Sequence, residues 1–142
     1  MRLAIQYSPG FSRDLWGWKL RVAPAPSGRV EVVWETKTSE PRKTHEHRFR
    51  ARSLPDWWPA LSAALDAVDF GLLPPTTPWR AGLDDAPMLF IERREADVVR
   101  NCSIFYAPKL WPELPLATHR ALQTVVSLLD PLARALHTSR DT

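Results

Sequence analysis

The stretch "RVEVVWETKTSEPRKTHEHRFRAR", residues 29–52, alternates between two kinds of side chain on both sides of the turn "SEPR". Successive side chains of a β-strand point to opposite faces, so an alternation of period two predicts a half-buried strand. The side chains predicted to face inward are Val30, Val32, Trp34 and Thr36 in the first strand, and His45, His47, Phe49 and Ala51 in the second. This stretch therefore predicts an antiparallel hairpin over residues 30–38 and 44–51.

Charge favours one register for this hairpin. If Trp34 faces Phe49, three outer pairs of charged residues all have opposite sign, and such pairs stabilise a sheet by about 0.2–1 kcal/mol each. These pairs are Glu35 with Arg48, Glu31 with Arg52, and Lys37 with Glu46. In this register Arg50 lies opposite Val33 and the turn holds Arg42 and Lys43, so these three cations are expected to be unpaired.

The stretch "WGWKLRVAP", residues 16–24, alternates in the same way and predicts a strand before the hairpin. Its inward side chains are Trp16, Trp18, Leu20 and Val22. Trp18 is expected to face Trp34, and Arg21 to face Glu31. The three strands, residues 16–23, 30–38 and 44–51, form a predicted meander with Trp18, Trp34 and Phe49 on its buried face.

The rest of the chain predicts two helices and a second hairpin. Residues 53–71 carry a helical stripe of Trp57, Leu61, Ala64, Leu65 and Val68, with Asp56 as the predicted N-cap and Pro59 in the first turn. "MLFIERR" and "VVRNCSIFY" predict strands on either side of "EAD". A last helix is expected from about Leu116, with a buried stripe of Leu122, Val125, Val126, Leu129 and Leu132. Pro131 is expected to kink or restart it, with Asp130 as the new cap.

The order β-β-β-α-β-β-α predicts an α+β fold, in which a three-strand meander and a hairpin form an antiparallel sheet with both helices on one face. The 142 residues are expected to form a single α+β domain, 1–142. No stretch has the length and apolarity of a membrane span, and the N-terminus lacks the apolar run of a secretory signal. The one cysteine cannot form an internal disulfide, which is consistent with the expected cytoplasmic location.

Two groups of residues are candidates for metal binding or catalysis. His45 and His47 share one strand face, and Cys102 or His119 could add a third ligand. The sequence places no third ligand beside them, so we expect no metal and no cofactor. Cys102 could be a nucleophile, although its position between Asn101 and Ser103 in a predicted strand favours a small core residue.

Residues 73–87, "LPPTTPWRAGLDDAP", form a long proline-rich loop, and loops of this length usually have a function. Trp79 and Arg80 are residue types that anchor protein interfaces, and Trp111 lies in a second proline-flanked loop. Asp84 and Asp85 could match charges on a partner or act as a catalytic carboxylate pair. We therefore predict a partner-binding surface at these five residues, with a core plug as the alternative for the tryptophans.

The basic run at residues 42–52 is a second candidate surface. Net charge is +3 overall, but residues 1–52 carry +6 and residues 53–96 carry −4. A basic stripe is typical of nucleic-acid binding, and the candidate residues are Arg42, Lys43, Arg48, Arg50 and Arg52. The aromatic residues of the same strand point to the opposite face, so they cannot stack on bases beside these cations. Nucleic acid is therefore the less favoured partner.

Three segments carry a resemblance to a family: "WGWKLRVAP", "VDFGLLP", and "WRAGLDDAP" followed by a hairpin. In size and α+β layout most of the chain resembles the small immunity proteins that bacteria pair with polymorphic or contact-delivered toxins. The resemblance implies a cytoplasmic, non-enzymatic inhibitor that blocks a cognate toxin by direct contact. Such proteins are often acidic, whereas this chain is basic, which argues against a nuclease as the partner. The alternatives are a nucleic-acid-associated regulator using the 42–52 strand and an enzyme using Asp84/Asp85 or Cys102.

Overall fold

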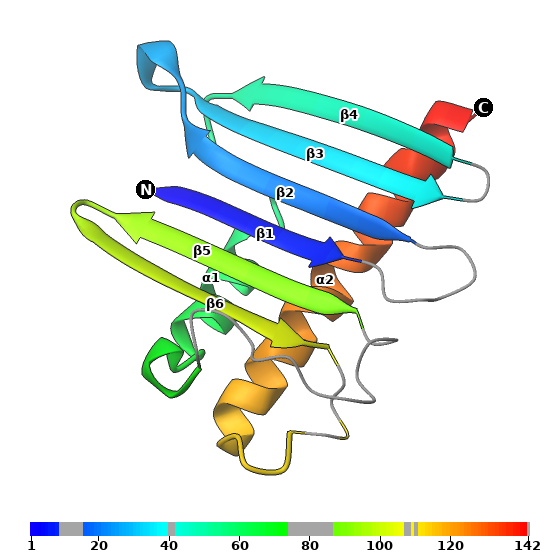
Figure 1. Cartoon of the computed structure of the whole chain (residues 1–142). Coiled ribbons are helices and arrows are strands. Elements are labelled where there is room, and N and C mark those ends of the chain that lie inside the picture. The colour runs from blue at the N-terminus through cyan, green and yellow to red at the C-terminus, as the bar shows by residue number, and fades with distance from the viewer. Residues whose placement is uncertain (9–15, 40–41, 74–86, 107–108, 110, 142) are drawn as a thin grey trace.

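The structure is a computed structural model that describes residues 1–8, 16–39, 42–73, 87–106, 109 and 111–141. Strands and helices follow one another in an α+β order (Figure 1). The strands are β1 (Arg2–Ser8), β2 (Gly17–Pro24), β3 (Val30–Ser39), β4 (Arg42–Ala51), β5 (Met88–Glu95) and β6 (Val98–Phe105). The helices are α1 (Trp58–Asp66) and α2 (Leu116–Asp141), with short 3-10 turns η1 (Pro26–Gly28) and η2 (Phe70–Leu72).

The described strands form one antiparallel sheet of order β4-β3-β2-β1-β5-β6, which confirms the predicted α+β class. The predicted order of elements was incomplete because β1 was missed. β1 pairs with β2 on one side and with β5 on the other, so it joins the meander and the second hairpin into one sheet (Figure 1). Its sequence "RLAIQYS" does alternate: Leu3 and Ile5 are buried, while Arg2 is exposed.

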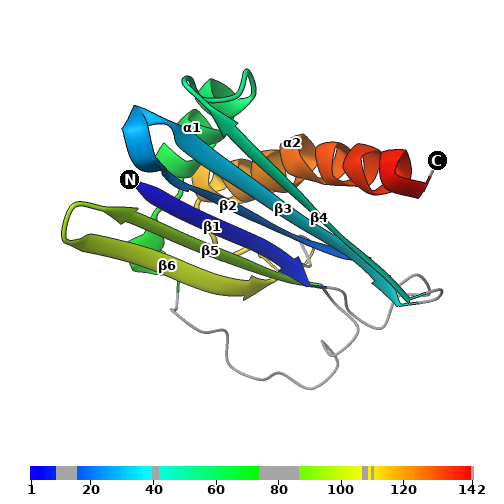
Figure 2. The same ribbon diagram turned by 90° about the horizontal axis from the view of Figure 1, so that it is seen from above.

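Both helices cover the same face of the sheet, as predicted, and none of the described helices lies over the opposite face of the strands (Figure 2). The side chains that point toward the helices are buried, and they include Leu3, Ile5, Trp18, Leu20, Val22, Trp34, Leu89, Ile91 and Cys102. From the helices, Leu61, Leu65, Leu122, Val125 and Leu129 complete this core. None of the described helices is long and apolar enough to cross a membrane.

The helix termini differ from the sequence predictions. The N-cap of α1 is Trp57, whose side chain makes no capping bond, so the prediction of Asp56 as the cap was wrong. α2 runs without a break from Leu116 to Asp141 through Pro131, so the predicted restart was also wrong. Pro131 is exposed, and the carbonyl that it cannot bond, four residues earlier at Ser127, also lies on an exposed residue. Water can therefore satisfy that carbonyl without ending the helix.

The register of the meander is shifted by two residues from the prediction. Trp34 lies opposite His47 rather than Phe49, and Leu20 rather than Trp18 lies opposite Trp34. β3 and β4 extend to Ser39 and Arg42, which leaves only residues 40–41 between them, whereas "SEPR" was expected to be the turn. Loop length fixes hairpin register, and a shift of two keeps each side chain on its predicted face.

The predicted faces are confirmed, but the predicted burial is only partly so. Trp18 and Trp34 are 2% exposed, as expected. Phe49 shares their face but is 48% exposed, so its predicted burial was wrong. β4 is the edge strand, and Phe49 therefore has no further strand beside it among the described residues.

Candidate functional site

The open face of the sheet gathers arginines from strands that are far apart in the sequence. One row of paired residues crosses it, from Arg48 through Val33, Arg21 and Ala4 to Glu92. Beside this row, Arg2 of β1 lies opposite Arg94 of β5. The row and its neighbours bring long charged side chains around short apolar ones, and the consequence is a hollow.

This hollow has a volume of about 370 Å³. Its charged lining residues are Arg2, Arg21, Arg48, Arg94, Glu31 and Glu92, and its short ones include Ala4, Ala23 and Val33. Val33 is only 5% exposed although neither of the two described α-helices lies over this face. Its direct cross-strand neighbours are Arg21 and Arg48, whose aliphatic stems can cover it while their charged ends stay in water.

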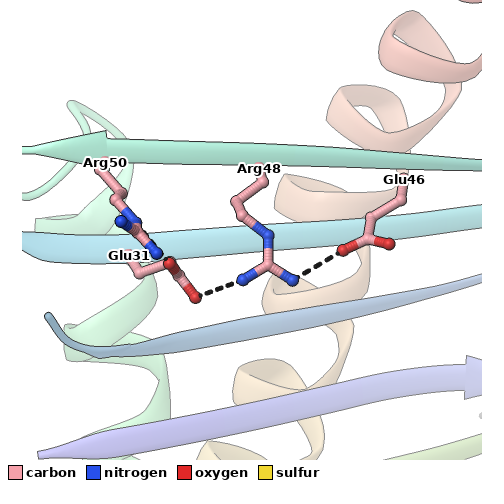
Figure 3. Close-up of polar contacts among 4 residues, drawn as sticks. All are labelled: Glu31, Glu46, Arg48 and Arg50. Carbon is pink, nitrogen blue, oxygen red and sulfur yellow. Dashed lines mark hydrogen bonds and ion pairs between the residues drawn. The ribbon is translucent and has the colours of Figure 1, made fainter.

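Carboxylates hold part of this arginine cluster in place (Figure 3). Arg48 donates through Nη1 to Oε1 of Glu31 at 2.8 Å and through Nη2 to Oε1 of Glu46 at 2.9 Å. Arg50 donates through Nε to Oε2 of Glu31 at 2.7 Å. Glu31 thus bridges two arginines of the neighbouring strand, and that fixes the direction of both guanidinium groups.

The same contacts shift the pKa values of Glu31 and Arg48. The hydrogen bond from Arg50 lowers the pKa of Glu31, and the positive charges of Arg48 and Arg21 lower it further. The hydrogen bond to Glu46 and the charge of Glu31 raise the pKa of Arg48. Arg48 and Arg50 are exposed and Glu31 is only half-buried, so the ion pairs are screened by solvent and add little to stability. Their effect is to order the charges on the surface.

The hollow keeps an excess of positive charge, because four arginines and two glutamates line it. Arg94 lies 3.8 Å from Glu92, measured from Nη2 to Oε1. Within the described part of the chain, no carboxylate lies within ion-pair distance of Arg2 or Arg21. A concave surface with convergent guanidinium groups is suited to carboxylate or phosphate ligands.

The basic run at residues 42–52 contributes only part of this surface. Arg48 and Arg50 lie on the open face as predicted, but both pair with Glu31, so the prediction that Arg50 is unpaired was wrong. Arg42 and Lys43 belong to β4 rather than to a turn, and Arg52 lies one residue beyond the strand and is exposed. Arg2 and Arg94 were not predicted as site residues, and the position of Arg21 beside them was not predicted either.

The predicted partner-binding residues have different outcomes. Trp79, Arg80, Asp84 and Asp85 lie outside the described residues. Trp111 is 3% exposed, and its Nε1 donates a 3.0 Å hydrogen bond to the carbonyl oxygen of Phe105. Its ring meets the rings of Tyr106 and His119 edge-on. The ring of Trp111 is thus a core plug in this fold, and its surface is not open to a partner.

The candidate metal ligands do not converge. The described residues contain no group of three His, Cys, Asp or Glu side chains that could hold a metal ion. The ring of His45 lies against that of His137, with 4.5 Å between centroids, and Nδ1 of His137 is 2.8 Å from Oγ1 of Thr36. Cys102 is in β6, at the edge of the sheet opposite to β4, and His119 packs on Trp111.

Cys102 is placed as a core residue. It is fully buried, opposite Ile91 in the β5–β6 pair, and burial raises the pKa of its thiol to about 12. A thiol with that pKa stays protonated at neutral pH, and the protonated form is a poor nucleophile.

The comparison with known sequences adds no family. No protein-family model matches the chain, and no curated protein sequence matches it significantly.

Proposed function

We propose that the protein is a non-catalytic binding module that presents the open face of its sheet to an acidic surface of a protein partner. The observation that carries this proposal is the convergence of Arg2, Arg21, Arg48 and Arg94 from four strands around one shallow hollow. Arginine is enriched at protein interfaces, where its planar group binds carboxylates with two parallel hydrogen bonds. The carboxylates of the partner would enter between these guanidinium groups.

A protein fits this surface better than a nucleic acid does. Glu31, Glu46 and Glu92 stand among the arginines and would repel a phosphate backbone. Trp18 and Trp34, which could otherwise stack on bases, are buried under the helices. A surface that carries both signs of charge is typical of selective contact with another protein.

The biological role in this proposal is that of an immunity protein, a cytoplasmic inhibitor that neutralises a cognate bacterial toxin by covering part of it. The resemblance to such proteins supports the role. The 74–87 loop, with Trp79, Arg80, Asp84 and Asp85, stays a predicted second contact region. Catalysis through Asp84 and Asp85 stays an untested alternative.

A nucleic-acid-associated regulator is the second candidate, and one observation favours it. Arg2, Arg21 and Arg94 of other strands lie beside the β4 residue Arg48, so the positive charge extends over several strands of the open face. This candidate predicts phosphate contacts at the same hollow, so one experiment can separate the two.

The experiment compares three forms of the full chain as bait in a lysate of the native source. They are the parent, an Arg21→Gln/Arg94→Gln variant of the hollow, and an Arg29→Gln/Arg120→Gln control. The control removes the same charge from exposed residues outside the hollow. We expect a protein retained by the parent and the control, with a loss of tenfold or more in the hollow variant.

The recovered protein is then expressed with each form. Arrest of growth by this protein, and rescue by the parent but not by the hollow variant, would support the immunity role. Equal recovery by all three forms would overturn the open-face site. Recovery of nucleic acid instead of protein, removed by nuclease treatment, would favour the second candidate.

A further inference from the structure

An apolar groove lies on the helix side of the sheet, where β3 and β4 meet the start of α1 and the C-terminal half of α2. Its volume is about 610 Å³, which is within the range of about 300–1,000 Å³ that is typical of small-molecule sites. Its large apolar residues are Trp34, Phe49, Leu54, Trp57, Leu132 and Leu136. The groove and the arginine hollow lie on opposite faces of the sheet and share none of their described lining residues.

The groove stays open because some of its lining side chains are too short to fill it. Ala51 of β4 and Ala135 of α2 are two of these. Trp34 is 2% exposed and forms part of the floor, whereas Phe49 and Leu54 are 48% and 39% exposed and stand at the mouth. Large apolar side chains that are exposed together around a hollow are typical of a ligand site.

Three aromatic rings, those of Trp34, Phe49 and Trp57, line the groove. Trp34 and Trp57 meet edge-on, with 6.0 Å between their centroids and 68° between their planes. Two rings at this angle form a corner rather than a flat wall. The face of an aromatic ring carries partial negative charge and attracts a cation, most strongly in tryptophan.

The charge of the groove also favours a cation. Asp56 is the only charged residue among its described lining residues, and it is exposed. Within the described part of the chain, no arginine or lysine lies within ion-pair distance of its carboxylate. Asp56 directly precedes Trp57 in the sequence, so a carboxylate and an aromatic ring stand together at the start of α1. Both groups attract a cation, and the carboxylate repels an anion.

We propose that this groove binds a small amphipathic cation, which is an organic ammonium group that carries an apolar chain. The ammonium group lies beside Asp56 and the aromatic rings, and the chain lies along Leu54, Leu132 and Leu136. The volume exceeds what an ammonium group alone would fill, and the remaining lining is apolar, so the chain contributes to binding. This inference does not rest on the open-face site, because the groove lies on the other face of the sheet.

The test follows the indole N–H signal of Trp57 in the NMR spectrum of the full chain, which a Trp57→Phe variant assigns. The probe is hexyltrimethylammonium at up to about 20 mM, since a ligand of about ten non-hydrogen atoms is expected to bind with millimolar affinity or better. Hexanesulfonate keeps the chain with the opposite charge, and tetramethylammonium keeps the cation without the chain. We expect the probe to shift the Trp57 signal, and both controls to bind at least threefold more weakly. The buried indole of Trp111, which is not a lining residue, should not shift.

Two variants locate the probe, and each has a matched control. Asp56→Asn is expected to weaken hexyltrimethylammonium at least threefold and not to weaken hexanesulfonate. Asp97→Asn removes the same charge from an exposed residue between β5 and β6 and should have no effect. Phe49→Ser should weaken the probe at least threefold, whereas Val99→Ser, at an exposed apolar residue of β6, should leave binding unchanged.

Any of five results would overturn the inference. Two come from the ligands, and these are no shift of Trp57 at the highest concentration and equal binding of hexanesulfonate. Two come from the variants, and these are equal weakening by Asp56→Asn and Asp97→Asn, and loss of binding in Arg21→Gln/Arg94→Gln, which would place the probe on the open face. The last is a shift of the Trp57 signal that grows with protein concentration without ligand, because this result identifies a second copy of the chain as the occupant.

Discussion

Nε1 of Trp18 donates a 2.9 Å hydrogen bond to Oδ1 of Asp130, which joins β2 to α2 across 112 residues of chain. The same oxygen accepts a 2.8 Å hydrogen bond from Nε1 of Trp16. Oδ2 of Asp130 accepts from Nε of Arg134 at 2.9 Å, and the guanidinium carbon of Arg134 lies 4.7 Å from the centre of the Trp16 ring. One carboxylate thus satisfies two buried indoles and fixes where α2 crosses the sheet.

Replacing Asp130 by Ala should destabilise the fold strongly. Two buried indole N–H groups would lose their acceptor, and each unsatisfied buried donor costs about 1–3 kcal/mol. We expect Asp130→Ala to lower the free energy of unfolding by about 2–4 kcal/mol in urea denaturation. Asp130→Asn keeps one carbonyl oxygen and should cost less.

Asp66→Ala is the matched control for this variant. Asp66 pairs with Arg93 at 2.6 Å, but its side chain is 65% exposed, and exposed pairs contribute about 0–1 kcal/mol. If Asp130→Ala and Asp66→Ala lower stability equally, the two indoles find other partners and Asp130 does not fix α2.

Trp111→Phe tests whether this residue stabilises the core or anchors a partner. Phenylalanine keeps most of the ring but loses the donor to the carbonyl oxygen of Phe105, so the free energy of unfolding should fall by about 1–3 kcal/mol. Binding of a partner, measured well below the melting temperature, should be unchanged. An unchanged melting temperature with weakened binding would restore the interface role.

The thiol of Cys102 should be unreactive in the folded protein. Burial raises its pKa to about 12, so the thiolate is scarce at pH 8, and the residue is also closed to solvent. Ellman's reagent should react only as fast as the protein unfolds, and at once in denaturant. A Cys102→Ser/Ser103→Cys variant moves the thiol to the open face of the same strand and should react quickly. Fast native reaction of the parent would contradict the placement of Cys102.

Purified protein should contain no stoichiometric zinc. The imidazole of His45 lies against that of His137, and the two proposed third ligands lie elsewhere in the fold. Elemental analysis of protein prepared without an affinity tag measures this, and added EDTA should leave the melting temperature unchanged. Stoichiometric metal that is lost in a His47→Ala variant would contradict the expectation.

Alternation predicted the faces of the meander but could not fix its register. Trp34 is buried in the observed register, and it would be buried in the predicted one too, because a shift of two residues preserves the face. Pairing of opposite charges did not fix the register either. In the observed register Glu31 lies opposite Arg50 rather than Arg52, and Glu35 lies opposite another acid, Glu46. The number of residues between β3 and β4 decides the register. The strand propensities of the residues near the turn did not indicate that the strands extend to Ser39 and Arg42.

The open-face site could not be assembled from the sequence because it depends on strand order. Arg21, Arg48 and Arg94 come from three strands, and Arg2 comes from β1, which was missed. The alternation in "RLAIQYS" was the available signal for β1. Its place between β2 and β5 is a long-range pairing that no local pattern specifies. The 42–52 run was visible as a charged strand, but its neighbours across the sheet were not.

Glu31→Gln should strengthen binding to anions, because Glu31 neutralises both Arg48 and Arg50. The parent is expected to bind generic duplex DNA only weakly and with strong salt dependence. Removing the carboxylate frees up to two guanidinium groups for phosphate. The logarithm of affinity against the logarithm of salt should then become steeper by roughly 1–2, since each phosphate contact adds about 0.9.

Acid should reproduce this effect only at low pH. The hydrogen bond from Arg50 and the neighbouring positive charges lower the pKa of Glu31, so this carboxylate stays ionised to a pH below its usual titration range and is neutralised only as the pH falls through the lowered value. The DNA affinity of the parent and that of Glu31→Gln are measured as a function of pH, and their ratio isolates the contribution of Glu31. This ratio should stay constant between pH 7 and pH 5. Glu35→Gln is the matched control, because it removes the same charge from the same face of β3. Equal gains in DNA affinity in the two variants would mean that net charge alone causes the effect. A sub-micromolar, sequence-selective complex of the parent at physiological salt would identify nucleic acid as the partner.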